Sequence, residues 1–279
     1  MGNMLRRLTY SPQLTNLARK AGLAPAFRSL YYRWAAPHGV LKIQVSNVHF
    51  KLRAENPEEV RDLEGASMFN DCSWSERHTL EACLAFLVPG DIVYDVGANY
   101  GLYSIALGKR VGERGQVIAF EPLGRNFSRL QANIQLNNLE NIRCFPYALG
   151  EQAGKTEIYL QEEHPWCATL LKGTPNSREA LPVEVVQVME GDGFRSTQGL
   201  PVPRAIKIDV EGFEYSVMRG LRQTLADSRC EFLVCEVHHQ FLPSGIGVED
   251  ILGLLRSCGF DRIESQTRGF ELHIFCYKG

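Results

Sequence analysis

Five short apolar runs without polar alternation recur along the chain, and stretches of helical periodicity separate them. A strand that is apolar at every position is buried on both faces, as in a parallel sheet covered by helices on both sides. The pattern therefore predicts a doubly wound α/β fold with a mostly parallel sheet. The expected strands are 92–96, 117–120, 142–145, 205–208, 232–237 and a last strand at 272–277, and the helical stretches are 102–110, 126–136, 215–225 and 248–258.

The N-terminal part of the chain is strongly basic. Residues 1–53 contain nine Lys or Arg, and all 32 acidic residues lie after residue 53. An aromatic stripe at 27, 30, 31 and 34 predicts a helix, and period-two alternation around Ser46-Asn47 predicts a hairpin. We expect a basic arm and cap over 1–70 and a second domain over 71–279. The arm either packs against the acidic remainder or makes peripheral contact with a membrane; nucleic acid is not expected.

Composition places the chain among ordinary globular proteins. Of 279 residues, 44% are hydrophobic and 22% are charged, and no uncharged apolar stretch reaches the ~20 residues that a spanning helix needs. The N-terminus lacks the apolar region of a secretory signal. Eight cysteines form no C-x-x-C pair, which favours free thiols in a reducing compartment. We therefore expect a cytoplasmic protein.

The sharpest local signal is a strand that ends in an acid, enters a glycine-containing turn and continues into a helix. Asp95 ends the strand, and Gly97 and Gly101 mark the turn. Gly97 allows a ligand to approach the backbone, and Gly101 allows close helix–strand packing. Glu121 follows the next strand, where an acid can accept hydrogen bonds from ribose hydroxyls. The turn lacks the G-x-G-x-x-G pattern that seats a diphosphate, which argues against a dehydrogenase.

A set of motifs over about residues 90–260 resembles the FkbM-type family of S-adenosylmethionine-dependent methyltransferases. The resemblance implies a class I methyltransferase fold with seven strands and an antiparallel last strand, and methyl transfer to a hydroxyl. It also implies an acidic residue before the 206–212 motif, supplied by Glu190 or Asp192. The motifs are Asp95-Val-Gly-Ala-Asn-Tyr-Gly101, Glu121-Pro122, Leu136-Asn137, Ala148-Leu-Gly150 and Ile206-Lys-Ile-Asp-Val-Glu-Gly212.

The resemblance also implies the cofactor and its contacts. S-adenosylmethionine would lie against the turn, with Glu121 on the ribose hydroxyls and Pro122 beside it. Asn99 has a second explanation, because a turn asparagine tolerates left-handed geometry. The methionine part would be surrounded by Asp95, Gly97, Asn99 and Gly101, and the adenine would be bordered by Tyr147, Ala148 and Leu149.

Two strand ends supply candidates for catalysis. Lys207 and Asp209 share one face of their strand, and Glu211 follows them; Glu236 and His238 share a face at the next strand end. Methyl transfer needs a group that takes up the acceptor's proton, and His238, Asp209 or Glu211 could do so. Lys207 and Asp209 have a second explanation as a structural ion pair. Two histidines near carboxylates could hold a divalent ion, but the spacing does not require one, so no metal is expected.

Two other classes of function remain at this point. One is a nicotinamide-dependent oxidoreductase, and the other is a catalytically idle binding module directed by the basic arm. We favour an S-adenosylmethionine-dependent O-methyltransferase that acts on a sugar, glycan or natural-product acceptor. The polar, aromatic loop 161–170 is the expected wall of the acceptor site. The sequence does not identify the acceptor or the oligomeric state.

Overall fold

The computed structural model describes residues 20, 24–56, 59–60, 75–160, 168–169, 183–268 and 271–279. The chain divides into two compact units, residues 1–78 and 79–279. The predicted domain boundary at residue 70 lies outside the described residues. Among the residues that are described, no helix has both the length and the apolar character needed to cross a bilayer.

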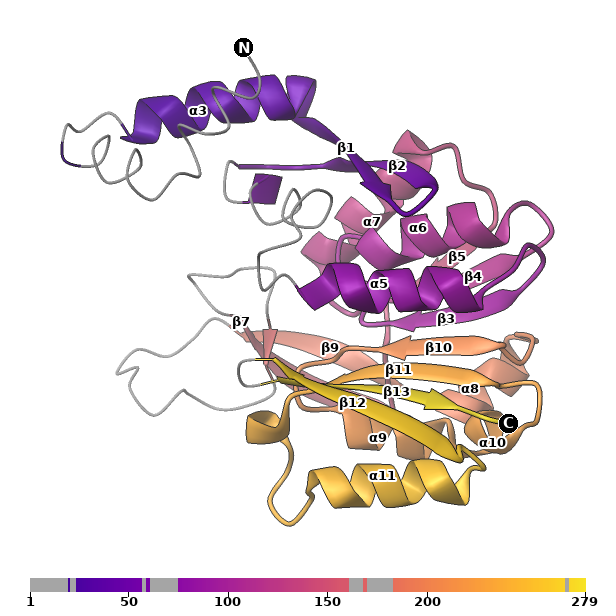
Figure 1. Cartoon of the computed structure of the whole chain (residues 1–279). Coiled ribbons are helices and arrows are strands. Elements are labelled where there is room, and N and C mark those ends of the chain that lie inside the picture. Colours follow the sequence, from indigo (N-terminus) through magenta and orange to yellow (C-terminus); the bar gives the residue numbers. More distant parts are fainter. Residues whose placement is uncertain are drawn as a thin grey trace. The chain divides into compact units, whose positions relative to one another are not determined.

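The first unit contains the predicted helix and hairpin (Figure 1). In the hairpin, Leu41, Ile43 and Val45 are buried, as period-two alternation requires. On the helix, Tyr31 is buried, whereas Leu30 and Trp34 are 51% and 43% exposed. Residues 1–19 and the Phe27 side chain lie outside the described part, so membrane contact by the arm stays a prediction. The elements are α3 (Ala24–Ala35), η1 (Pro37–Gly39), β1 (Val40–Val45) and β2 (Val48–Arg53).

The second unit is built on a seven-stranded sheet with the order β12-β13-β11-β10-β3-β4-β5. From β11 through β5 all neighbours are parallel, whereas β13 is antiparallel to both β11 and β12. This confirms the expected class I methyltransferase topology. The strands are β3 (Ile92–Val96), β4 (Gln116–Phe120), β5 (Ile142–Phe145), β10 (Ala205–Ile208), β11 (Phe232–Val237), β12 (Arg262–Arg268) and β13 (Glu271–Tyr277).

Helices cover both faces of this sheet (Figure 1). α5, α6 and α7 lie on one face, and α8 to α11 lie on the other. Between the sheet and the second group of helices, large apolar side chains such as Tyr94, Phe120 and Phe260 are almost fully buried. The helices are α5 (Ser75–Phe86), α6 (Leu102–Val111), α7 (Gly124–Leu136), α8 (Gly191–Thr197), α9 (Glu214–Gly220), α10 (Arg222–Ala226), η2 (His239–Phe241) and α11 (Val248–Ser257).

A small second sheet, with the order β6-β9-β7-β8, is inserted between β5 and β10. Its strands lie between residues 148 and 190. Most of the expected acceptor loop 161–170 lies outside the described residues. The strands are β6 (Ala148–Gly150), β7 (Gly154–Leu160), β8 (Ala168–Thr169) and β9 (Val183–Glu190).

The two acids at the end of this insertion both stabilise helix starts. Glu190 caps α8 by accepting hydrogen bonds from the backbone N–H groups of Asp192 and Gly193. Asp192 accepts hydrogen bonds from the backbone of Gln223 and Thr224 at the start of α10. Helix N-termini leave N–H groups without intrahelical partners, and these carboxylates supply the missing acceptors.

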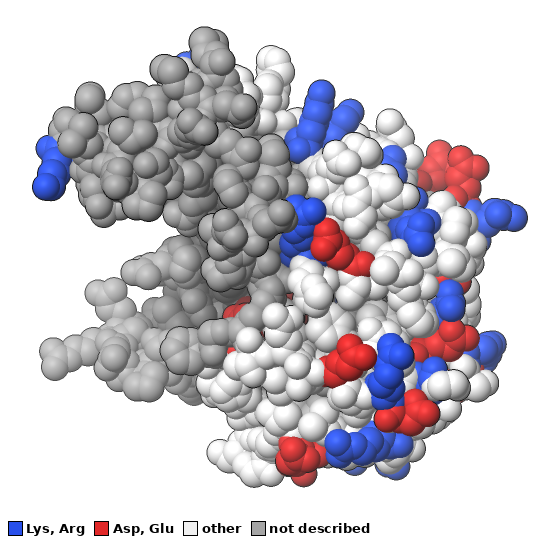
Figure 2. Space-filling model, viewed as in Figure 1, with Lys and Arg blue, Asp and Glu red and all other residues white. Residues whose placement is uncertain are grey.

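On the face in Figure 2, basic and acidic side chains of the described residues lie interspersed. Six cysteines in the described part are free thiols, as predicted, and five of these are buried. Cys72 and Cys167 lie outside the described residues.

Candidate active site

The turns that follow β3 and β10 are in direct contact at one edge of the sheet. Asp209 donates its backbone N–H to the carbonyl of Val96 at 3.1 Å. A Cβ atom added to Gly97 would clash with the carbonyl oxygen of Asp209, and Gly97 has a φ of 81°. Only glycine fits such a position. The turn with the cofactor motif and the predicted catalytic strand end are therefore adjacent.

The turn over residues 97–101 needs three left-handed residues. Asn99 has a φ of 51°, and Gly101 has a φ of 100°. A Cβ on Gly101 would lie 2.7 Å from Cδ1 of Leu130, so the glycine allows α6 to pack closely against α7. The Asn99 side chain accepts a hydrogen bond from the N–H of Tyr100 at 2.9 Å. Asn99 thus supplies both the backbone geometry and a local hydrogen bond.

Asp95 is fully buried beneath this turn. Its Oδ2 accepts a hydrogen bond from the hydroxyl of Ser104 at 2.5 Å. Its Oδ1 has no hydrogen-bond partner among the residues that the structure describes, and it lies 3.5 Å from the ammonium of Lys207. The carboxylate therefore supports the turn from below and is not part of its accessible surface.

Lys207 links the acids of two strands. Its ammonium donates a hydrogen bond to the carbonyl of Gly97 at 2.8 Å and lies 3.4 Å from Oδ2 of Asp209. It also lies over the ring of Tyr103. The side chain is almost fully buried. Lys207 thus forms the ion pair with Asp209 that the sequence offered as its second explanation, and it reaches Asp95 as well.

Glu121 joins the turns after β3 and β4. Its two carboxylate oxygens accept backbone hydrogen bonds from Asn99 at 2.7 Å and from Leu123 at 2.9 Å. Burial raises the pKa of Glu121 to about 7, although these hydrogen bonds and the charge of Lys207 act in the opposite direction. Such a shift identifies Glu121 as a carboxyl group that can change protonation near neutral pH.

The remaining residues of the predicted cofactor site differ in accessibility. Pro122 is partly exposed beside Glu121. Ala148 is also partly exposed and packs against a small cluster that includes Leu123. Leu149, in contrast, is almost fully buried in the main core. Of the two predicted neighbours of adenine in β6, only Ala148 offers accessible surface.

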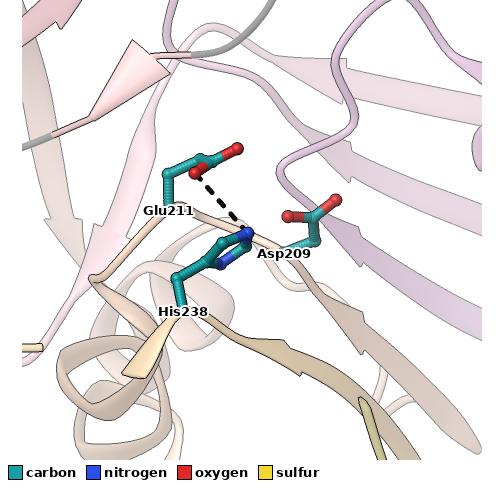
Figure 3. A group of neighbouring side chains, drawn as sticks. All are labelled: Asp209, Glu211 and His238. Atoms are coloured by element: carbon teal, nitrogen blue, oxygen red, sulfur yellow. Dashed lines mark ion pairs between the residues drawn. The ribbon is translucent and has the colours of Figure 1, made fainter. Parts of the chain in front are cut away.

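Asp209, Glu211 and His238 form a group of three side chains at the ends of β10 and β11 (Figure 3). The potential ligand atoms of the three lie within 4.8 Å of one another. The side chains of Asp209 and Glu211 are about a quarter exposed, whereas that of His238 is 3% exposed. Glu211 has a φ of 51°, an uncommon conformation for a glutamate. Sequence spacing predicted these residues separately, and the sheet brings them together.

Burial and charge change the protonation of this group. Burial raises the pKa of Glu211 to about 7. For His238, burial alone would lower the pKa, but the hydrogen bond to Glu214 and the charges of Glu211 and Asp209 raise it to about 9. The neighbouring carboxylates thus favour the protonated form of the imidazole, which disfavours His238 as the group that takes up a proton.

Two further residues complete the cluster. Glu214 is fully buried, and its Oε1 accepts hydrogen bonds from Nδ1 of His238 and from the N–H of Gly212, both at 2.8 Å. Glu236 lies between two histidines, 3.6 Å from Nε2 of His238 and 3.4 Å from Nε2 of His273. The sequence predicted Glu236 but not Glu214 or His273.

Comparison with known proteins assigns the family. Residues 95–262 match the model of the methyltransferase FkbM domain. The hexuronic acid methyltransferase AglP of Haloferax volcanii is 24% identical over 76% of this chain and 78% of that protein. The 31-O-demethyl-FK506 methyltransferase FkbM of Streptomyces tacrolimicus is 27% identical over 71% of this chain and 82% of that protein.

A similar solved structure is the precorrin-6y C5,15-methyltransferase of Geobacter metallireducens, with a TM-score of 0.46 and 10% identity. That comparison covers 78% of this chain and 96% of the other.

The family model covers more than half of the chain, so the protein belongs to the FkbM methyltransferase family. It is an S-adenosylmethionine-dependent methyltransferase. The residues present fit this cofactor. Glu121 lies at the strand end where ribose hydroxyls would bind, and each of its carboxylate oxygens accepts one backbone hydrogen bond and keeps a second lone pair.

Proposed function

We propose that the protein methylates a hydroxyl group of a sugar, glycan or natural-product acceptor. The observation that carries this proposal is the contact between Gly97 and Asp209. It places two partly exposed carboxylates, Asp209 and Glu211, beside the turn that would hold the methyl donor. A hydroxyl acceptor needs a nearby group that takes its proton, and these carboxylates supply one.

The cofactor would lie across the turns after β3 and β4. In this arrangement Glu121 accepts hydrogen bonds from the ribose hydroxyls. Gly97, Asn99 and Gly101 give the turn the backbone shape that contacts the methionine part. Pro122 and Ala148 would line the side toward adenine. Asp95 acts as a positioning residue, because it is buried and reaches the turn through Ser104 and Lys207.

S-adenosylmethionine supplies, when bound, a methyl group on a positively charged sulfur. The residues at the end of β10 would orient the acceptor hydroxyl toward this methyl group. The hydroxyl proton passes to a carboxylate at the end of β10. Asp209 and Glu211 are the candidates because their side chains are accessible, whereas His238 and Glu214 are buried. Lys207 holds Asp209 in place.

The names of the relatives support an oxygen acceptor. AglP is named as a hexuronic acid methyltransferase, and FkbM as a 31-O-demethyl-FK506 methyltransferase. A carboxylate-rich edge suits a molecule with several hydroxyl groups, because carboxylates accept hydrogen bonds from hydroxyls. We therefore propose small polyhydroxylated molecules as partners, with glycans included.

The test is transfer of a labelled methyl group from S-adenosylmethionine to a panel of hexuronic acids, neutral sugars and hydroxylated polyketides. Each product is treated with mild alkali, which cleaves methyl esters and leaves methyl ethers intact. An alkali-stable product supports the proposal. Transfer only to carboxyl or amino groups contradicts it. Loss of transfer in Asp209→Asn and Glu211→Gln, with cofactor binding retained, would assign the carboxylates to the acceptor side.

A further inference from the structure

The three side chains in Figure 3 have the composition and spacing of a metal site. One imidazole and two carboxylates, from two neighbouring strand ends, place their ligand atoms within 4.8 Å of one another. Neighbouring ligands of a six-coordinate ion with bonds of about 2.1 Å stand about 3 Å apart, and opposite ligands about 4 Å. Small side-chain rotations of Asp209 and Glu211 would close this group around one ion.

The orientation of His238 is an independent observation that points to a cation. The ring is almost fully buried, and its Nδ1 donates to the buried carboxylate of Glu214. Nε2 lies 3.5 Å from Oε2 of Glu211 and 3.6 Å from Oε1 of Glu236, which are ion-pair distances, and a cation bound at this position would replace the proton on Nε2. Metal-binding histidines characteristically donate their second ring nitrogen to a carboxylate, as here.

The surrounding charge is strongly negative. Five carboxylates lie within 3.6 Å of the ammonium of Lys207 or the ring nitrogens of His238, so acidic groups outnumber these two basic groups. Buried charges are stable only when opposite charges compensate them. A divalent cation at the centre of the group would provide this compensation. The five are Asp95, Asp209, Glu211, Glu214 and Glu236.

We propose that Asp209, Glu211 and His238 bind one divalent cation, with Glu214 orienting the histidine. The mixture of carboxylate oxygens and one imidazole favours an ion such as Mn²⁺ over Ca²⁺. Three protein ligands leave open coordination positions. On the function proposed above, two neighbouring hydroxyl oxygens of the acceptor would fill these positions, the ion would lower the pKa of the hydroxyl that is methylated, and its proton would pass to the non-coordinating oxygen of Asp209 or Glu211.

The direct test measures Mn²⁺ binding to the full-length protein after treatment with a chelator. Electron paramagnetic resonance separates free from bound Mn²⁺, and we expect one ion per chain. Proton NMR of the histidine rings provides a second readout on the unaltered protein. Bound Mn²⁺ should broaden the signal that His238→Gln removes. The absence of bound Mn²⁺ at millimolar concentration, or unbroadened His238, would overturn the proposal.

Variants locate the site. Asp209→Asn and Glu211→Gln should weaken Mn²⁺ binding at least tenfold. Glu249→Gln, an exposed acid on α11, serves as the control and should bind as the unaltered protein does. Equal affinity in all of these proteins would contradict the proposed ligands. If a variant fails to fold, the NMR measurement on the unaltered protein tests the site instead, because it needs no change to the carboxylates.

The metal site and the methylation reaction can fail separately. If alkali-stable methylation continues at full rate in excess chelator and no Mn²⁺ is bound, the proposed metal site is wrong and the proposed function stands. If Mn²⁺ binds at the three residues but no hydroxyl compound is methylated, the proposed metal site stands and the proposed function is wrong.

Discussion

Nδ1 of His238 and Oε1 of Glu214 are 2.8 Å apart, and this hydrogen bond ties the end of β11 to the turn after β10. A carboxylate oxygen accepts, so Nδ1 carries the proton and Nε2 faces Glu211 and Glu236. The same oxygen of Glu214 accepts the N–H of Gly212. One buried carboxylate therefore fixes both the backbone beside Glu211 and the ring of His238.

Removal of the Glu214 carboxylate should destabilise the protein. Glu214→Ala leaves two buried donors without an acceptor, and each such donor costs about 1–3 kcal/mol. We expect the free energy of unfolding to fall by about 2–5 kcal/mol, measured by urea denaturation. Glu113→Ala, at an exposed turn, is the control and should change it by less than about 0.5 kcal/mol. Equal effects would show that Glu214 does not hold the two strand ends together.

Gly97 should tolerate no side chain, because of the carbonyl of Asp209. Gly112 provides a matched control, since its φ of 66° is also left-handed but a Cβ there would meet nothing within 4 Å. Gly112→Ala should cost about 1–3 kcal/mol from backbone strain alone, because a φ of 66° with a ψ of −174° is essentially restricted to glycine. Gly97→Ala should add the clash and cost several times more, or prevent folding. Thermal denaturation compares the two; similar losses would refute the close contact.

Much of the fold could be predicted because the buried strands are mostly apolar and lack polar alternation. The runs at β3, β4, β10 and β11 therefore favoured a sheet covered on both faces. β12 was not predicted, because it is an edge strand whose residues, such as Arg262 and Glu264, are polar and exposed. Edge strands are commonly charged, so they carry a weak signal.

The site could be predicted only in part. Acids at strand ends identified Asp95, Glu121, Asp209 and Glu236, since a buried acid there needs a partner. The role of Glu214 depends on a contact with His238, which lies 24 residues away, and no periodicity encodes such a pair. Its one signal was an acid in the first turn of a helix, which a helix dipole explains equally well.

The ammonium of Lys207 should be essential for stability because it compensates Asp95. Lys207→Met leaves a fully buried carboxylate beside an uncharged side chain, which costs about 3–5 kcal/mol. Adding Asp95→Asn should recover part of this loss, since the buried charge is then gone. Arg229→Met breaks the exposed pair with Asp227 and should cost less than about 1 kcal/mol. Urea denaturation of the unaltered protein, Lys207→Met, Asp95→Asn and the double variant measures the coupling; additive losses would contradict it.

The cofactor affinity should depend on pH through Glu121. Burial raises the pKa of this carboxyl group to about 7, so at pH 6 it is mostly protonated and at pH 8 mostly ionised. Ribose hydroxyls donate hydrogen bonds, and the ionised form is the better acceptor. Binding therefore favours loss of the proton, and the affinity for S-adenosylhomocysteine should rise with pH, by up to about tenfold per unit below pH 7.

Glu121→Gln isolates this effect because an amide does not titrate. The variant should bind S-adenosylhomocysteine about tenfold or more weakly at pH 8, since a hydrogen bond to a charged group contributes about 1.5–3 kcal/mol. Its affinity should also be nearly constant between pH 6 and 8. Glu211→Gln removes the other carboxyl group with a pKa of about 7 and should keep the slope of the unaltered protein. Isothermal titration calorimetry in buffers of different ionisation enthalpy measures the proton released. A slope that survives in Glu121→Gln would assign the titration to another group and remove Glu121 from the ribose site.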